Sequence, residues 1–219
     1  MNYCQFRNET IKRMANAGGA TPILPPEYQQ VEWLENGGTG RCYLYIDYGV
    51  TQGANYHITI NFEFVGAPSG AIIGGDTGNS SLYPIYSVNC TSKTIAYSGC
   101  DMYLTDMTAG IRYTLDYYYN DGYYGYLNAV QLVTNPPANN TTNNYLCLYY
   151  SKYGGYSSPC KIYDVTVRDS YNGTVLYRLI PCYRILDSKP GMYDIAKGTF
   201  CDGKLAISNP GTYIVGNNV

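Results

Sequence analysis

The sequence predicts an all-β fold, a two-sheet β-sandwich or jelly roll, and three observations support this. The stretch from Tyr56 to Phe64 alternates apolar and polar residues, as a strand with one buried face does. Short stretches rich in Gly, Asn, Asp and Pro separate the candidate strands. No convincing long helical pattern follows residue 25. Strands at this spacing are typical of sandwiches and jelly rolls.

The first 24 residues differ from the rest and are predicted to form an appendage to a domain spanning residues 25–219. In NETIKRMANAGG, Asn8 is a candidate N-cap and the Gly18–Gly19 pair is a stop signal, so a short helix is expected. TPILPP follows and is predicted to be extended, because proline restricts itself and its predecessor. Two interpretations of this appendage stay open: it is a frayed terminus, or it is a segment that docks into a larger assembly. No apolar stretch of signal-peptide length stands at the start, so ordinary export is not expected.

The predicted strands follow from period-two patterns. Each of three predicted strands is expected to have one row of side chains that points into the core. These rows are Tyr56, Ile58, Ile60, Phe62 and Phe64; Ile111, Tyr113 and Leu115; and Tyr163, Val165 and Val167. The Asp-Gly pair in YNDGYYG is a strong hairpin signal. In GTVLYRLIPC, Pro181 is expected to end the strand or to mark an edge.

Composition excludes some classes of function. Charged residues make up 14% of the chain and the net charge is -2, with the 14 Lys and Arg scattered, so nucleic-acid binding is not expected. No apolar run approaches the ~20 residues that span a bilayer, so a membrane protein is not expected. The eight cysteines are predicted to be free and to behave as small apolar residues. A hairpin disulfide between Cys90 and Cys100 is the alternative.

Three segments resemble a known family. They are LPPEYQQVEWLENGGTGRCYLYIDYGV, NYHITINFEF, and CKIYDVTVRDSYNGTVLYRLIPCYRILDSKPGMYDIAKGTFCDG, of which the last is the specific one through its order of IPC, GMYD and G-x-F. Together they resemble the concanavalin A-like, LamG-like jelly roll of bacteriophage and prophage structural proteins and of surface proteins of gut bacteria. The resemblance covers roughly residues 24 to 205. The chain departs from the family's opening by an insertion and by Tyr48 in place of threonine.

Local chemistry agrees with this resemblance. Asn172–Gly173 is predicted to turn a hairpin, and Gly198 to allow a second turn. Met192 and Phe200 are predicted inward anchors, and Cys182 a packed core thiol.

The residues predict that the chain is not an enzyme. A glycosidase needs two carboxylates facing each other at roughly 5–9.5 Å, but Glu32 and Glu35 point to opposite faces of a strand and Glu63 has no acidic partner two residues away. The single histidine, His57, is expected to be an exposed strand residue, and no G-x-S-x-G elbow accompanies it. No cofactor is expected. Calcium is a weaker alternative, with Asp76 and Asn79 as candidate ligands.

Tyrosine is the unusual feature of the composition, with 28 residues. Its ring packs while its hydroxyl stays in water, and Tyr, Ser, Gly and Asn together are typical of adaptable recognition surfaces. Three roles for these tyrosines stay open. They can form a recognition surface for glycan or protein, cover a broad sheet without binding anything, or form a subunit interface. The residues assigned to this surface are Tyr118, Tyr123, Tyr124, Tyr126, Tyr149, Tyr150, Tyr153 and Tyr156.

The resemblance implies a phage virion structural protein, such as a head or tail fibre, a capsid decoration protein or an adhesin. Such a protein would be made in the host cytoplasm, released by lysis and found in the virion. Its expected partners are other virion proteins, further copies in a trimer or array, and a host-surface glycan, with many copies turning weak binding into firm attachment. The alternatives are a carbohydrate-active enzyme, a carbohydrate-binding module or a bacterial surface lectin-like protein.

Overall fold

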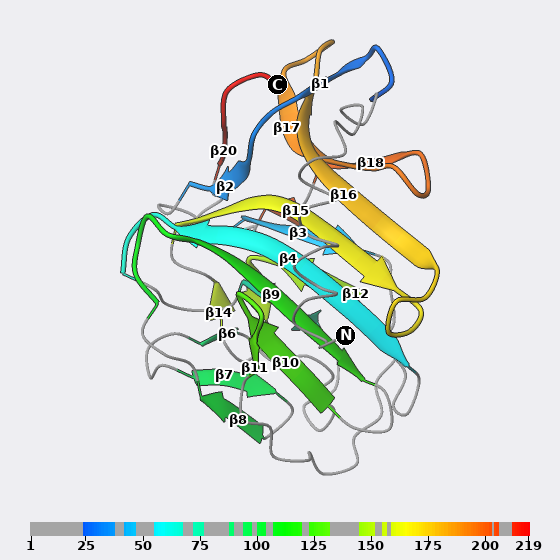
Figure 1. Cartoon of the computed structure of the whole chain (residues 1–219). Helices are drawn as coiled ribbons and strands as arrows, with labels where there is room; N and C mark the ends of the chain where they lie inside the picture. Colours follow the sequence, from blue (N-terminus) through cyan, green and yellow to red (C-terminus); the bar gives the residue numbers. More distant parts are fainter. Residues whose placement is uncertain are drawn as a thin grey trace.

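The predicted all-β class is confirmed: all regular structure in the described residues is β-strand (Figure 1). The computed structural model describes residues 24–37, 42–46, 55–67, 72–76, 88–89, 94–97, 100–103, 107–119, 123–131, 145–151, 155–156, 159–202, 204–205 and 212–219. The predicted helical appendage and Cys90 lie outside these residues. The division into residues 1–24 and 25–219 stays a prediction.

A large antiparallel sheet of eleven strands forms one layer of the sandwich. Its main order is β11-β10-β9-β4-β15-β16-β17-β18, with β1, β2 and β20 attached at its side. Its strands are β1 (Tyr28–Gln30), β2 (Leu34–Asn36), β4 (Tyr56–Phe64), β9 (Arg112–Tyr119), β10 (Tyr123–Leu127), β11 (Val130–Gln131), β15 (Cys160–Arg168), β16 (Val175–Arg184), β17 (Lys189–Asp194), β18 (Thr199–Cys201) and β20 (Tyr213–Val215).

A second sheet of order β19-β3-β12-β5 lies behind the large one (Figure 1). Its strands are β3 (Cys42–Ile46), β5 (Ile73–Asp76), β12 (Tyr145–Leu148) and β19 (Lys204–Leu205). Two small sheets complete the described structure, namely β6 (Val88–Asn89) with β7 (Thr94–Tyr97) and β8 (Cys100–Tyr103), and β13 (Tyr150–Ser151) with β14 (Gly155–Tyr156). The architecture is that of a jelly-roll β-sandwich.

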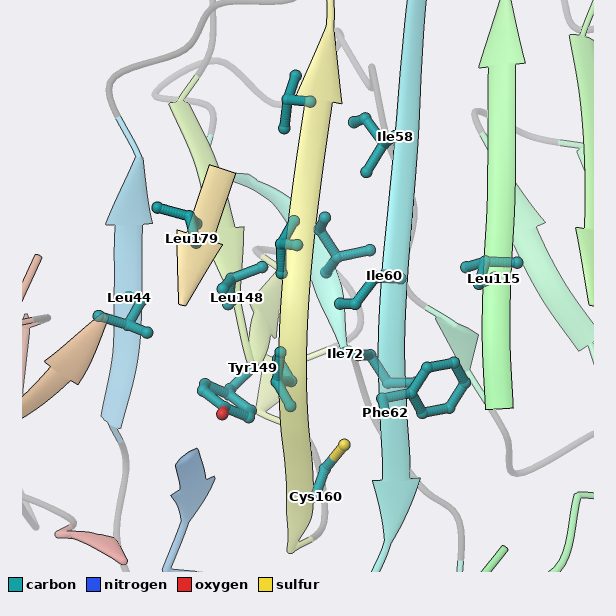
Figure 2. Packing of buried hydrophobic residues seen from close by; sticks show 14 of the residues in the cluster. Leu44, Ile58, Ile60, Phe62, Ile72, Leu115, Leu148, Tyr149, Cys160 and Leu179 are labelled. Carbon is teal, nitrogen blue, oxygen red and sulfur yellow. The ribbon is translucent and has the colours of Figure 1, made fainter. Parts of the chain in front are cut away.

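The core fills the space between the two layers (Figure 2). Strand β4 supplies the inward row that its alternation predicts, and Ile58, Ile60 and Phe62 are fully buried. Leu44 and Leu148 meet them from the second sheet. Because the inward row of β4 is wholly apolar, its polar residues are left on the opposite face of the large sheet.

A β-bulge changes the alternation of β15. The register with β4 shifts between Ile162 and Asp164, so Ile162 and Val165 point inward although they are three residues apart. The predicted inward position of Tyr163 is therefore wrong, because its hydroxyl lies on the other face and donates to Glu63. A sequence pattern of period two cannot reveal the inserted residue.

Two further expectations are corrected near strand ends. Ile111 is 49% exposed, because β9 begins only at the following residue. Strand β16 continues through Pro181 as far as Arg184 and is not an edge there. The proline stands where the neighbour of β16 changes from β15 to β1, so its missing N–H falls between two ladders.

The predicted hairpins of the C-terminal motif are confirmed, and so is one of its two predicted anchors. Gly173 N–H donates to the carbonyl of Ser170 at 3.0 Å, and Asn172 adopts a left-handed conformation with φ of 57°. Gly198, with φ of +68°, turns the chain between β17 and β18. Met192 is fully buried in the core, as predicted. The inward position predicted for Phe200 is wrong: it pairs with Tyr193 on the opposite face from Met192 and packs half-buried in a second cluster with Leu24, Ile180, Cys182 and Tyr193.

The cysteines that the structure describes as free are Cys147, Cys160, Cys182 and Cys201. Burial raises the pKa of the Cys182 thiol to about 12 and that of Cys201 to about 11, so both are held as packed, protonated thiols. Within the described part of the chain, no helix is long and apolar enough to cross a membrane.

Candidate functional site

The face of the large sheet that points away from the second sheet, called here the outer face, is polar and aromatic. Cross-strand register places its members side by side. They are Glu35 of β2; His57, Thr59, Asn61 and Glu63 of β4; Arg112, Thr114, Asp116 and Tyr118 of β9; Tyr124 and Tyr126 of β10; Lys161, Tyr163, Asp164, Thr166 and Arg168 of β15; and Arg178 of β16.

Four tyrosine rings gather at one side of the outer face, and we call them the tyrosine cluster. Tyr118 stacks on Tyr124 and Tyr126 with centroids 5.0 and 6.2 Å away and interplanar angles of 18° and 13°. Tyr171, from the hairpin between β15 and β16, lies 4.3 Å from the Tyr118 ring. Tyr118 is only 9% exposed and supports the others, whereas Tyr124, Tyr126 and Tyr171 are half-exposed.

His57 packs beneath the tyrosine cluster and is held by hydrogen bonds. Its Nε2 lies 3.1 Å from Asp116 Oδ1, and the same oxygen accepts a 2.6 Å hydrogen bond from the Thr59 hydroxyl. Its ring meets those of Tyr118 and Tyr171 at 5.5 and 5.4 Å. At 6% exposure, His57 is buried, so the expected exposed position is wrong. The tyrosines of β9 and the hairpin cover it, and neither neighbour follows from the pattern of β4.

A hydrogen-bonded network adjoins the cluster on the same face. Asn61 Nδ2 donates to both carboxylate oxygens of Asp164 at 2.9 Å, and the Thr114 hydroxyl donates to Asn61 Oδ1 at 2.5 Å. Burial raises the pKa of Asp164, although the hydrogen bond from Asn61 acts in the opposite direction. This carboxylate lies within strand β15, opposite Asn61 of β4.

Glu63 is the centre of a second polar group on the outer face. It accepts hydrogen bonds from Lys161 Nζ at 3.0 Å and from the Tyr163 hydroxyl at 2.7 Å. Burial alone would raise the pKa of Glu63, but these two donors outweigh it and lower the pKa. Burial and the hydrogen bond to Glu63 raise the pKa of Tyr163 to about 12. The Arg112 guanidinium lies 3.8 Å from the centre of the Tyr163 ring.

The structure brings together three of the tyrosines that the sequence assigned to a surface, Tyr118, Tyr124 and Tyr126. Tyr149 is corrected: it is fully buried between the sheets, and its hydroxyl donates to the Leu34 carbonyl. Tyr149 directly follows the end of β12 and has a left-handed backbone conformation, with φ of 67°. This conformation interrupts the alternation of inward and outward side chains along the strand.

For the other tyrosines that the sequence assigned to a surface, the structure gives the strand pairing of three and does not describe the fourth. Tyr123 pairs with Tyr119 at the end of β10, and Tyr150 pairs with Tyr156. Tyr153 lies outside the described residues. Sequence reasoning missed Tyr171, and the Tyr-Asn-Gly of its predicted hairpin was the available signal.

The described residues contain no group of three or more His, Cys, Asp or Glu side chains arranged to hold a metal ion. Of the two candidate calcium ligands, Asp76 ends β5, where it pairs with Tyr145, and Asn79 lies outside the described residues. The calcium site stays a prediction.

Comparison with known proteins finds similar solved structures only. No family model and no curated protein matches the chain. One similar solved structure is "Alginate lyase AlgAT5 from Polysaccharide Lyase family 7", with 14% identity over 71% of this chain and 88% of that chain and a TM-score of 0.42. Another is the carbohydrate recognition domain of Emp47p, with 7% identity over 69% of this chain and 92% of that chain and a TM-score of 0.37. These likenesses concern the fold alone.

The expectation that the chain is not an enzyme is corrected by this comparison. The finding that stands against it is that an alginate lyase is among the similar solved structures.

Proposed function

We propose that the outer face of the large sheet binds glycans, with the tyrosine cluster as the platform on which sugar rings stack. The observation that carries the proposal is the parallel stacking of Tyr124 and Tyr126 against a buried Tyr118. Tyrosine combines an apolar ring with a hydroxyl that hydrogen-bonds, which suits a ligand with apolar ring faces and polar edges.

The platform is rigid before any ligand arrives. The Tyr118 ring is enclosed by Tyr124, Tyr126, Tyr171 and His57, and the His57 ring is fixed by its contact with Asp116. A binding surface that is already ordered loses less side-chain entropy when it binds. This favours recognition over a role as loosely packed surface filling.

The core does not need the exposed rings. On β10 the inward positions are held by Gly125 and Leu127, which are buried, while Tyr124 and Tyr126 alternate with them on the outer face. Polar groups of the neighbouring strands, including Thr59 and Asp116, lie in the same register and offer hydrogen-bond partners for sugar hydroxyls.

The experiment measures binding of the full chain to a panel of soluble polysaccharides by calorimetry. Tyr124→Ala and Tyr126→Ala are expected to weaken binding at least about tenfold each, as truncation of a central aromatic contact does. Tyr183→Ala, at a half-buried tyrosine of β16 away from the cluster, is the control and should bind as the unmodified chain does.

Two results would overturn the proposal. One is the absence of binding across the panel, and the other is binding that the cluster variants leave unchanged. Reducing ends and the ultraviolet absorbance of unsaturated sugars are followed in the same samples. Product release that depends on the cluster would assign turnover to this face in addition to binding.

The virion role stays a prediction that rests on the sequence resemblance. The IPC and GMYD motifs that carry the resemblance lie in β16 and β17. In that setting, the outer face would serve an adhesin or fibre that contacts host-surface glycans, and many copies would add avidity. Mass spectrometry of purified phage particles tests this role separately from sugar binding. The chain's absence from particles would contradict it.

A further inference from the structure

We propose that the glycan bound by the outer face is acidic, and that Arg178 recognises its uronic-acid carboxylates. The inference rests on the proposed function and adds the substrate class. It starts from the charged side chains of this face: the carboxylates of Glu63, Asp116 and Asp164 each accept a hydrogen bond, whereas one guanidinium has no hydrogen-bond acceptor.

Three of the outer-face carboxylates accept hydrogen bonds, and a fourth, Glu35 of β2, lies opposite Lys161. Glu63 accepts from Lys161 and Tyr163. Asp116 accepts from Thr59 and contacts His57, and Asp164 accepts from Asn61 with Arg112 at 3.8 Å. A carboxylate that already faces cationic or hydrogen-bonding groups repels an approaching anion less than a free one does.

The basic side chains are engaged as well, with one exception. Arg112 and Lys161 pair with carboxylates, Arg168 donates to the Gly173 carbonyl at 3.0 Å, and Lys197 donates to the Tyr177 hydroxyl. Among the Arg and Lys side chains that the structure describes on these strands, the Arg178 guanidinium is the one that has no hydrogen bond or ion pair, although its charge acts on Asp164 and lowers the pKa of that carboxyl.

Position also favours Arg178. It lies in the exposed middle of β16, opposite Thr166, and its neighbours Tyr177 and Leu179 point into the core. The backbone there is fixed, because Arg178 N–H donates to Asp194 at 3.0 Å. An exposed guanidinium on a fixed strand presents a planar fork of donors that matches a carboxylate with two parallel hydrogen bonds.

Arg178 and the tyrosine cluster lie on one line across the strands. Successive pairs join Tyr126 to Asp116, Asp116 to Thr59, Thr59 to Thr166 and Thr166 to Arg178. Four strand spacings of about 4.8 Å place the ends of this line about 19 Å apart. A polysaccharide segment that stacks on the cluster and runs across β9, β4 and β15 therefore brings an acidic group on a later sugar to Arg178.

The test compares polygalacturonate with the neutral polymer made from it by chemical reduction of its carboxyl groups. The full chain should bind polygalacturonate at least tenfold more tightly, and added salt should reduce the difference. Arg178→Gln should remove the preference while neutral binding is retained. Arg184→Gln is charge-matched, and its guanidinium is already bound by Asp187, so it should keep the preference.

Each outcome separates the substrate class from the proposed function. If Arg178→Gln keeps the preference, or Arg184→Gln loses as much of it, the inference is wrong, while loss of all binding in Tyr124→Ala would still support the glycan platform. Equal binding of both polymers also overturns the inference. Dextran sulfate is titrated in parallel, and Arg178-dependent binding to it but not to polygalacturonate would refute the assignment to uronic acids. A chain that binds no polymer overturns both proposals.

Discussion

Truncating Tyr118 should destabilise the fold much more than truncating Tyr124, although both belong to the tyrosine cluster. Tyr118 is 9% exposed and its ring lies 4.3 to 6.2 Å from those of Tyr171, Tyr124, His57 and Tyr126. Removing a buried aromatic ring costs roughly 3–5 kcal/mol, and each aromatic pair contributes about 0.5–1.5 kcal/mol. We expect Tyr118→Ala to lose about 3 kcal/mol of unfolding free energy, and the half-exposed Tyr124→Ala about 1 kcal/mol.

Urea unfolding followed by circular dichroism measures both losses, and scanning calorimetry should show the melting temperature of Tyr118→Ala lowered by about 6–12 °C for a chain of this size. Tyr118→Phe keeps the ring and should retain most of the stability. Equal losses in the two alanine variants, or a loss below about 1 kcal/mol for Tyr118→Ala, would refute the division into a supporting ring and exposed rings.

Three further predictions concern the frame that carries the outer face. Ile60→Asp should prevent folding, because a charge would enter a fully buried position, and soluble protein with native circular dichroism would contradict this. Gly191→Ala should lower stability in urea titrations, since a Cβ there would lie 2.4 Å from the Cys201 carbonyl oxygen; an unchanged midpoint would show that the strands can separate. Arg184 donates to Asp187 and lowers its pKa to about 2, below the ~3.9 of an unfolded chain, so the contact stabilises the fold above pH ~4 and is lost as pH falls through 2. The stability difference between the unmodified chain and Asp187→Asn should therefore shrink over that range, and a constant difference would contradict the pairing.

The fold could be predicted because its main signals are local. The alternation of β4 identifies the buried face of that strand without reference to any other strand. The two residues Asn172 and Gly173 mark the turn of the hairpin between β15 and β16. The errors arose where a neighbour changes the local pattern. The bulge beside Tyr163 turns that residue outward, and β1 takes over pairing where Pro181 interrupts the ladder.

The candidate site was less predictable because it is assembled from distant segments. The sequence indicated that Tyr118, Tyr124 and Tyr126 share a face, which follows from the predicted β9–β10 hairpin. Nothing local places Tyr171 over Tyr118, since β4 and β9 must first pair and the hairpin after β15 must then fold across His57. Equally, nothing local distinguishes these exposed rings from Tyr149, which an irregular backbone at the end of β12 carries into the core.

The bulge in β15 connects the fold to the proposed site. Without it, strict alternation from the inward Ile162 would turn Asp164 inward, toward the apolar core, and Tyr163 and Val165 outward. The extra residue instead leaves Tyr163 and Asp164 both on the outer face, where one donates to Glu63 and the other accepts from Asn61. The same shift sets the face on which Thr166 lies, and through Thr166 it aligns Arg178 with Thr59 and Asp116. One inserted residue thus determines which polar groups lie between the tyrosine cluster and the Arg178 guanidinium.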